Sequence, residues 1–306
     1  MHEQFTLPHI DLIERHYRRF LLQERGLIEP TVDQYLPAVR RFLFHRFRNR
    51  KIRLKKLCPR DVRDFVLCDS SDRGRSSLQT ATTALRSFLG FLFQRGRIPL
   101  NLAVAVPAVA GWRLSKLPRF LETAQVARLL RSCDRRRKLG KRDYAILLLL
   151  ARLGLRAGEV AQICLEDINW DSAELQVRGK GAHVDRLPLL QDVGQAIADY
   201  LQKARPSCSS RRVFVRVNPP YVGFADSSAV SSMVRRNLAR ARLQPPHQGA
   251  HLLRHSLATG MLRGGASLSE IAQVLRHRQG QSAEVYAKVD LIALRALAQP
   301  WCGGAR

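Results

Sequence analysis

The chain has 306 residues, and its 52 lysines and arginines against 25 aspartates and glutamates give a formal net charge of +27. A hydrophobic fraction of 45% is enough for one large or two ordinary domains with apolar cores, which excludes a wholly disordered chain. The positive excess indicates a polyanionic partner, with nucleic acid as the first candidate and an anionic membrane surface as the second.

The first hundred residues predict a helical domain. Apolar residues at helical spacing favour four helices, over residues 9–26, 31–47, 59–67 and 77–96. Gly26 and Gly96 are expected to end the first and the last of them, and Pro37 favours a helix start or a kink within the second. Residues 98–121 contain three prolines and little periodicity, which indicates a linker between two domains.

The rest of the chain predicts helices around a small sheet. Helices are expected over residues 123–133, 141–154, 191–205, 227–243, 251–265 and 270–277. Segments 173–179 and 183–190 predict two strands joined by a tight turn, and Ser267 with Glu270 has the spacing of a capping box. The expected fold class is mainly α with a small β-sheet. The expected domains are residues 1–107 and 117–306, with a linker over 108–116.

Basic residues concentrate between Arg40 and Lys56, where nine of the seventeen residues are lysine or arginine and none is acidic. A solvated helix face is one interpretation, but this density favours a surface that contacts phosphates. The residues expected to bind DNA are Arg40, Arg41, Arg46, Arg48, Arg50 and Lys51.

Four short segments carry residues that could do chemistry. In "GLRAGE", Arg156 lies between a helix end and a new helix start, where a fixed guanidinium suits bidentate phosphate binding. In "RGKGAHVDR", Lys180 lies at a hairpin tip between glycines, from which it can reach another element. Taken alone, each of these is more commonly an ordinary surface residue.

The other two segments lie near the end of the chain. In "HLLRH", His251 and Arg254 share a helix face. His255 has metal-ligand spacing from His251, but the glutamate of the zinc-protease motif is absent and an intervening arginine would repel a cation, so we interpret His255 as structural. The segment "VLRHRQGQSAEVYAKVD" places His277 nine residues before Tyr286.

Together these residue types suit covalent cleavage of a phosphodiester. A tyrosine phenol, with a pKa near ~10, can act as the nucleophile once it loses its proton. Two arginines can stabilise charge on the non-bridging oxygens, and a mobile lysine can protonate the leaving sugar oxygen. No carboxylate cluster is available to hold Mg²⁺, so the reaction is expected to need no metal and no cofactor.

In order, spacing and local context, the four segments resemble the tyrosine recombinase (phage integrase) family, over roughly residues 117–290. The resemblance implies a helical core-binding, SAM-like DNA-binding domain over residues 1–107 and a catalytic domain over 117–306. It implies as catalytic residues Arg156, Lys180, His251, Arg254, His277 and Tyr286. It also implies that Glu159 and Asp167 support the arginine segment. Two features depart from the family: Arg276 stands where glycine is common, and the loop before Tyr286 lacks the usual threonine pair.

The function implied by the resemblance is site-specific recombination, of a mobile-element or Xer-like type. The two domains would clamp double-stranded DNA, and Tyr286 would form a 3′-phosphotyrosyl intermediate without ATP. Strand exchange would need a homotetramer on paired sites. Two alternatives stay open: a topoisomerase with the same chemistry, and a DNA-binding relative that has lost catalysis.

The six cysteines are scattered and form no CxxC pair, which favours a reducing cytoplasm over a disulfide-rich secreted protein. The N-terminus does not resemble a signal peptide, and no apolar segment is long enough to span a bilayer, so no membrane partner is expected. Residues 291–299 predict a short amphipathic helix. It needs a surface to pack on, in its own domain or on a neighbouring protomer.

Overall fold

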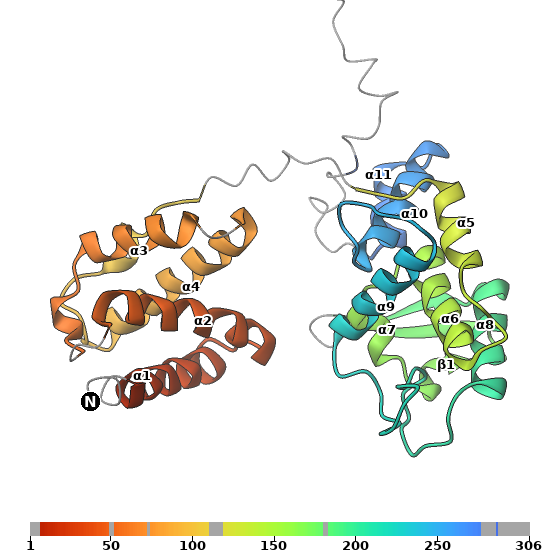
Figure 1. Cartoon of the computed structure of the whole chain (residues 1–306), viewed down its shortest axis with the longest axis horizontal. Helices are drawn as coiled ribbons and strands as arrows, with labels where there is room; N and C mark the ends of the chain where they lie inside the picture. Colours follow the sequence, from red (N-terminus) through yellow and green to blue (C-terminus); the bar gives the residue numbers. More distant parts are fainter. Residues whose placement is uncertain are drawn as a thin grey trace, which may run out of the picture. The chain divides into compact units, whose positions relative to one another are not determined.

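The computed structural model describes residues 7–48, 52–71, 74–109, 119–179, 183–276 and Tyr286. The chain divides into two compact units, Met1–Arg113 and Leu114–Arg306 (Figure 1). The predicted linker over residues 108–116 and the predicted tail helix over 291–299 lie almost wholly outside the described residues, so both stay predictions.

The first unit is helical, as predicted. Its elements are α1 (Leu7–Arg19), which continues as one π-helical turn (Phe20–Glu24), α2 (Glu29–Phe47), α3 (Pro59–Ser71) and α4 (Arg75–Gln94), with short 3₁₀ turns at Leu54–Lys56 and Leu102–Ala105. Pro30 lies in the first turn of α2, where a missing N–H costs nothing. Because α2 begins at Glu29 and runs through Pro37, the helix start proposed at Pro37 is excluded.

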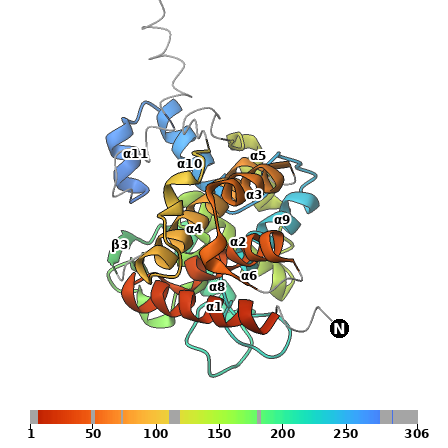
Figure 2. The same cartoon turned by 90° about the vertical axis from the view of Figure 1, so that its left-hand side faces the viewer.

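The core of the first unit is rich in aromatic side chains. The rings of Tyr17, Phe20, Phe88 and Phe91 lie with centroids 4.9 to 6.4 Å apart. Figure 2 shows α1 alongside α2, which agrees with their contacts in the structure. Residues 98–106 also pack here, since Ile98, Leu102 and Val106 are buried in the same core. The interpretation of this part of 98–121 as a linker was therefore wrong.

The second unit surrounds a central apolar helix. Its helices are α5 (Thr123–Arg131), α6 (Lys138–Arg152), α7 (Ala157–Gln162), α8 (Gln191–Lys203), α9 (Ser227–Arg240), α10 (His251–Arg263) and α11 (Leu268–Val274). In α6, residues 145–151 are all buried, because α5, α7, α8, α9 and α10 pack around this helix (Figure 1). No helix in the described ranges is long and apolar enough to cross a membrane.

A small antiparallel sheet completes the second unit. It comprises β1 (Ile168–Asn169), β2 (Glu174–Arg178) and β3 (Val184–Pro188) in the order β1-β2-β3. In the β2–β3 pair Val177 is opposite Asp185, which confirms the predicted hairpin. The two-residue strand β1 was not predicted, because it is too short to show a period, whereas α7 begins directly after Arg156, where a helix start was expected. The expected fold class, mainly α with a small sheet, is confirmed.

Candidate active site

The turn between α6 and α7 fixes Arg156. Gly154 ends α6 at φ +58°, a conformation that favours glycine, and a Cβ at this position would lie 2.7 Å from Leu275 Cδ2. Arg156 then has extended backbone angles, and α7 begins at the next residue. Helix α11 thus packs directly on the turn that carries Arg156.

Glu159 lies between two arginines. Its Oε2 accepts from the backbone N–H of Arg156 at 2.8 Å, and its Oε1 accepts from Arg156 Nη1 at 2.7 Å. The Arg276 Nη2 also donates to Oε2, at 2.8 Å. Although burial opposes ionisation, the Arg156 backbone N–H and the two guanidinium charges hold the pKa of Glu159 below its usual value. Glu159 therefore binds both the backbone N–H and the side chain of Arg156, and the supporting role predicted for it stays a prediction.

The second arginine is part of the protein interior. Arg254 on α10 is 3% exposed, and its guanidinium donates to the carbonyl oxygens of Gly154 and Leu275. Burial, followed by the charges of Arg156 and Arg276, lowers the pKa of Arg254 to about 10. Arg254 stays protonated at neutral pH, and it joins α10 to the ends of α6 and α11.

Tyr286 is the described part of the predicted nucleophile segment. Its side chain is 1% exposed and packs with Ala258, Ile271 and Leu275. The hydroxyl lies 2.9 Å from Nδ1 of His255, whose ring meets the phenol edge-on. Burial raises the pKa of Tyr286, and the charge of Arg254 opposes this shift. The phenol is thus both a packed side chain and a hydrogen-bonded one.

The two histidines of α10 are held neutral. Burial, the neighbouring His251 and the charge of Arg254 lower the pKa of His255 to about 4. Burial, Arg254 and Arg156 also lower the pKa of His251. A neutral imidazole can accept or donate a hydrogen bond, according to its tautomer. Among the described residues of the site, the positive charge at neutral pH therefore comes from the arginines.

The remaining predicted residues lie on or near the hairpin and the segment after α11. Asp167, which is 3% exposed, accepts from the Cys164 N–H at 2.8 Å and pairs with Arg178 at 2.7 Å. Arg178 lies on β2, two residues before Lys180, and the support of the arginine segment predicted for Asp167 stays a prediction. Lys180 and His277 lie outside the described residues.

The structure therefore brings Arg156, Glu159, His251, Arg254 and Tyr286 into one region of the second unit. It adds His255 and Arg276, to which the sequence interpretation gave no chemical role. For Arg276 the sequence signal was that an arginine stands where the family commonly has glycine. For His255 the spacing from His251 was visible, but it suggested a metal and not a tyrosine partner.

The basic stretch of the first unit is largely neutralised where it lies on α2. Arg40 pairs with Glu14 at 2.5 Å and with Asp11 at 2.6 Å. Two further ion pairs are Arg41–Asp69 at 3.0 Å and Arg46–Asp61 at 2.6 Å. These carboxylates lie on other helices, so the ion pairs could not be inferred from the stretch between Arg40 and Lys56, which contains no acidic residue. Arg50 and Lys51 lie outside the described residues, and DNA contact by all six predicted residues stays a prediction.

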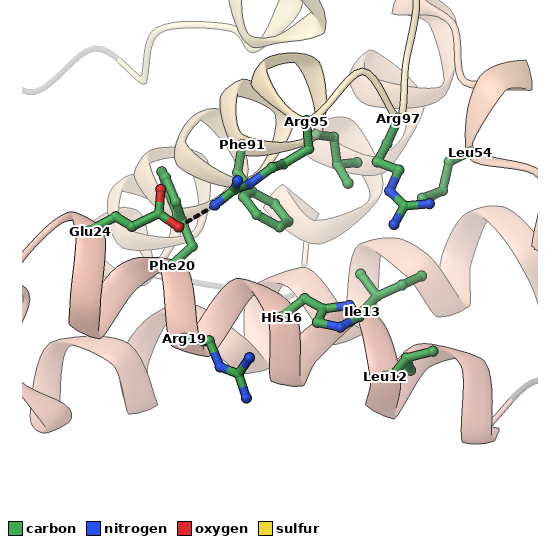
Figure 3. A pocket seen from close by; sticks show the side chains of 11 residues that line it. Leu12, Ile13, His16, Arg19, Phe20, Glu24, Leu54, Phe91, Arg95 and Arg97 are labelled. Atoms are coloured by element: carbon green, nitrogen blue, oxygen red, sulfur yellow. Dashed lines mark hydrogen bonds and ion pairs between the residues drawn. The ribbon is translucent and has the colours of Figure 1, made fainter.

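A second basic surface lies beside a pocket in the first unit. Leu12, Phe20 and Phe91 line this pocket, and Arg95 at its edge pairs with Glu24 (Figure 3). The adjoining groove is lined by Arg53, Lys55, Lys56 and Arg97, which we call the basic groove. All four are exposed, and none forms an ion pair with another described residue.

Residues 119–291 match the sequence family described as the phage integrase family, and residues 15–96 match its N-terminal SAM-like domain. A putative integrase/recombinase of Sinorhizobium fredii, y4rA, is 49% identical over 297 residues, which cover 96% of this chain and 72% of that protein. The chain belongs to the phage integrase family. It is a tyrosine-type site-specific DNA recombinase, an enzyme that cleaves DNA and transfers strands. The relatives do not favour the topoisomerase or the silent DNA-binding protein.

Solved structures agree at the level of the fold. XerH site-specific recombinase, bound to a palindromic difH substrate in a post-cleavage complex, has a TM-score of 0.72 at 17% identity, covering 94% of this chain and 84% of that one. A lambda integrase tetramer bound to a Holliday junction has a TM-score of 0.66 at 15% identity, covering 89% of this recombinase and 78% of that chain.

Proposed function

We propose that Tyr286 of this recombinase attacks the scissile phosphate while Arg156 and Arg254 bind its non-bridging oxygens. The observation that carries this assignment is that Arg254 and His255 lie on one turn of α10, where His255 contacts the Tyr286 hydroxyl and Arg254 reaches the turn that carries Arg156. His251 on the same helix assists proton transfer, and His277 adds a further hydrogen-bond donor.

The cleavage step exchanges one ester for another. The Tyr286 oxygen forms a bond to phosphorus, the bond from phosphorus to the 5′-oxygen breaks, and the phenol proton passes to solvent with the assistance of His251. Lys180 protonates the leaving oxygen, which departs as a 5′-hydroxyl. Attack by the 5′-hydroxyl of a partner strand reverses the step. Since the phosphotyrosine conserves the ester bond, no ATP is consumed.

His255 holds the phenol in its packed position. Burial, His251 and Arg254 lower the pKa of His255 to about 4, well below that of a phenol, so this imidazole is a poor acceptor for the Tyr286 proton. The buried phenol also has to reach the phosphate. We propose that DNA binding moves Tyr286 away from His255 and out of its apolar packing.

The test of the nucleophile is covalent trapping in the native host, followed by sequencing of the attached DNA. The wild-type protein is expected to form a protein–DNA adduct, and Tyr286→Phe is expected to form none while it keeps its fold and DNA affinity. An adduct formed by Tyr286→Phe would assign the nucleophile to another residue. The recovered sequence supplies the substrate for the experiments below.

The role of Lys180 has a separate test. A substrate with sulfur in place of the bridging 5′-oxygen has a leaving group that needs little protonation. We expect Lys180→Ala to cleave normal DNA far more slowly than the wild-type protein and to recover on the sulfur substrate. Equal defects on both substrates would reject the general-acid role.

We further propose that double-stranded DNA lies against the basic groove, and that recombination takes place in a homotetramer on paired sites. Four exposed cations that pair with no described carboxylate support the first statement, and the tetrameric assembly of the lambda integrase supports the second. The five described cysteines are free thiols, which supports a reducing compartment such as the cytoplasm.

The predicted tail helix provides a test of assembly. We propose that residues 291–299 pack on a neighbouring protomer. A protein that lacks residues 291–306 is then expected to fold and bind one site, but to form few two-site complexes in gel-shift and sedimentation experiments. Normal formation of two-site complexes would show that the tail is not needed for assembly. Failure of the truncated protein to fold would show that the tail packs in its own subunit.

A further inference from the structure

We propose that Arg276 is a third catalytic arginine, which donates to a non-bridging oxygen of the scissile phosphate together with Arg156 and Arg254. This inference rests on the proposed function of Tyr286. It assigns chemistry to a position where the sequence resemblance implies glycine and no role.

The first observation is that the Arg276 guanidinium is buried but incompletely bonded. Its side chain is 8% exposed, and its Nη2 donates to Glu159 Oε2 at 2.8 Å. Within the described part of the chain, Nε and Nη1 are buried and have no hydrogen-bond acceptor. The Asp185 carboxylate, 3.6 Å from Nε, attracts the charge but lies beyond hydrogen-bond distance.

Buried N–H groups of a charged side chain nearly always have acceptors, because their lost hydration is otherwise uncompensated. An anionic oxygen entering the site would supply the acceptor. The Nη1 atom is the better candidate to bind it, since Asp185 already lies near Nε.

The second observation concerns the backbone. Arg276 has φ +53°, a left-handed conformation that side chains with a Cβ rarely adopt and that glycine adopts freely. The residue is therefore unfavourable on two independent counts, its backbone and its unbonded N–H groups. Strain of this kind persists at sites where the side chain has a use. Glycine at this position would remove both unfavourable features, whereas a bound anionic oxygen would satisfy the free N–H groups of the arginine.

The third observation is the balance of charge. Arg156 and Arg276 bind opposite oxygens of the single Glu159 carboxylate. Arg254 lies within the field of both, and its own hydrogen bonds go to neutral carbonyls. Asp185 is partly exposed and lies at the edge of this group. Three guanidinium charges against one buried carboxylate leave a positive excess, which favours an anion.

The ligand that fits this excess is a phosphodiester. It carries one negative charge in the ground state, and a second develops on the non-bridging oxygens as the Tyr286 oxygen attacks. Donors already fixed in a buried site stabilise the developing charge more than the initial one. Arg276 keeps its proton throughout, so the bonds made and broken are those of the proposed transesterification.

A purely positioning role gives a different result in one experiment. If Arg276 only held Glu159, and through it Arg156, its loss would slow cleavage of any substrate by the same factor. If Arg276 binds a phosphate oxygen, its loss matters less when that oxygen carries no charge. A methylphosphonate at the scissile position replaces one charged non-bridging oxygen by a neutral methyl group.

The experiment measures adduct formation under single-turnover conditions on the duplex recovered by trapping, with phosphate or with each methylphosphonate diastereomer at the scissile position. Arg276→Gly suits the backbone and is expected to fold. We expect it to lower the rate on phosphate by about 10²- to 10³-fold. On at least one diastereomer the loss should be less than about tenfold, because the donor has then lost its charged acceptor.

Two further variants separate charge from shape. Arg276→Lys keeps the charge and should retain part of the rate on phosphate, whereas Arg276→Gln should resemble Arg276→Gly. The control is Arg152→Gln, which removes an exposed arginine paired with Asp192 and should leave every rate unchanged. Equal losses on phosphate and on both diastereomers would overturn the proposal in favour of positioning, and no loss on phosphate would overturn it outright.

A different result would contradict the proposed function. If Tyr286→Phe still forms the adduct, Tyr286 is not the nucleophile, regardless of the rates measured for the Arg276 variants. A second readout needs no DNA: inorganic phosphate should raise the melting temperature of the wild-type protein more than that of Arg276→Gly. Equal shifts for the two proteins would count against an anion site at Arg276.

Discussion

Arginines are used in opposite ways on α2 of the first unit and in the active site of the second. On α2 of the first unit, Arg40, Arg41 and Arg46 each face at least one carboxylate supplied by another helix. In the active site, Arg156 and Arg276 share Glu159, and Arg254 donates to main-chain carbonyls. The first arrangement neutralises charge and stabilises packing, whereas the second leaves charge in excess. The pairing of arginines, and not their density along the sequence, therefore indicates where an anion binds.

The largest effect is expected from the buried arginine. Arg254→Ala should reduce adduct formation by at least about 10²- to 10³-fold, because a fixed donor to the phosphate is lost. It should also lower the free energy of unfolding by about 1–3 kcal/mol, because the buried carbonyls of Gly154 and Leu275 lose their donor. Single-turnover cleavage and urea unfolding measure the two effects.

The matched control is on the same helix. Arg263→Gln removes an arginine of α10 that pairs with Glu122 at the surface, so cleavage should not change. An Arg254→Ala protein that cleaved DNA as fast as this control would contradict the catalytic role of Arg254, and with it the contrast between neutralised and catalytic arginines.

The next effect comes from removing the shared carboxylate. Glu159→Gln leaves Arg156 and Arg276 without an anion between them, which should lower the free energy of unfolding by about 3 kcal/mol at pH 7 and slow cleavage. The folded-state pKa of Glu159 lies below its unfolded value, so its contribution is complete above about pH 4.3 and is lost as the pH falls through the folded-state pKa. The difference between wild type and variant should therefore narrow below about pH 4. A difference that stayed constant down to pH 3 would contradict this coupling.

A smaller effect is expected at the tyrosine partner. His255→Phe removes one hydrogen bond that holds Tyr286 in its packed position, so it should ease release of the phenol and raise the rate of adduct formation by up to about tenfold, whereas His255→Gln should stay closer to the wild-type rate. The pKa of His255 falls from an unfolded value of 6.5 to about 4 in the folded protein. Between these values the unfolded chain binds the extra proton, so the wild-type protein loses stability as the pH falls.

The His255→Phe protein lacks this proton uptake. Its melting temperature should decline less than that of the wild-type protein between pH 6.5 and pH 4. Equal declines in the melting temperatures of the two proteins would show that the fold does not keep the His255 imidazole neutral.

The smallest effect tests the first unit. Replacing Arg53, Lys55, Lys56 and Arg97 by glutamine should reduce the slope of log K against log salt by up to about 3–4, since each phosphate contact contributes about 0.9. Replacing the paired residues Arg40, Arg41 and Arg46 should change the slope little and should lower stability instead. Fluorescence anisotropy between 50 and 200 mM salt compares the two sets. A larger change in slope for the α2 substitutions than for the basic-groove substitutions would show that DNA contacts α2 instead.

Local sequence patterns predicted most of the fold. The helices over 31–47 and 77–96 were predicted because their apolar stripes are long, and the hairpin because β-formers flank a glycine turn. Ile98, Leu102 and Val106 were misplaced in a linker, because prolines broke the period although the apolar residues still reach the core. Burial of this kind depends on partners far along the chain, which a periodicity argument does not include.

The site was predicted in part, for a similar reason. Residues in short motifs, such as Arg156 and Arg254, could be identified because their order and spacing are informative. The contact of His255 with Tyr286 spans 31 residues, and the pairing of Arg276 with Glu159 spans 117. Neither contact produces a recognisable pattern within a short stretch of sequence. The carboxylates that neutralise Arg40 and Arg41 were missed in the same way.

One hydrogen bond in the second unit has a mechanical consequence. The backbone N–H of Leu121, at the start of the described part of that unit, donates to Ser256 Oγ at 2.8 Å, and Ser256 in turn bonds to Leu252 O on α10 at 2.8 Å. Ser256 directly follows His255. The chain that enters the second unit is therefore fastened to the middle of α10, one residue from the group that contacts the tyrosine.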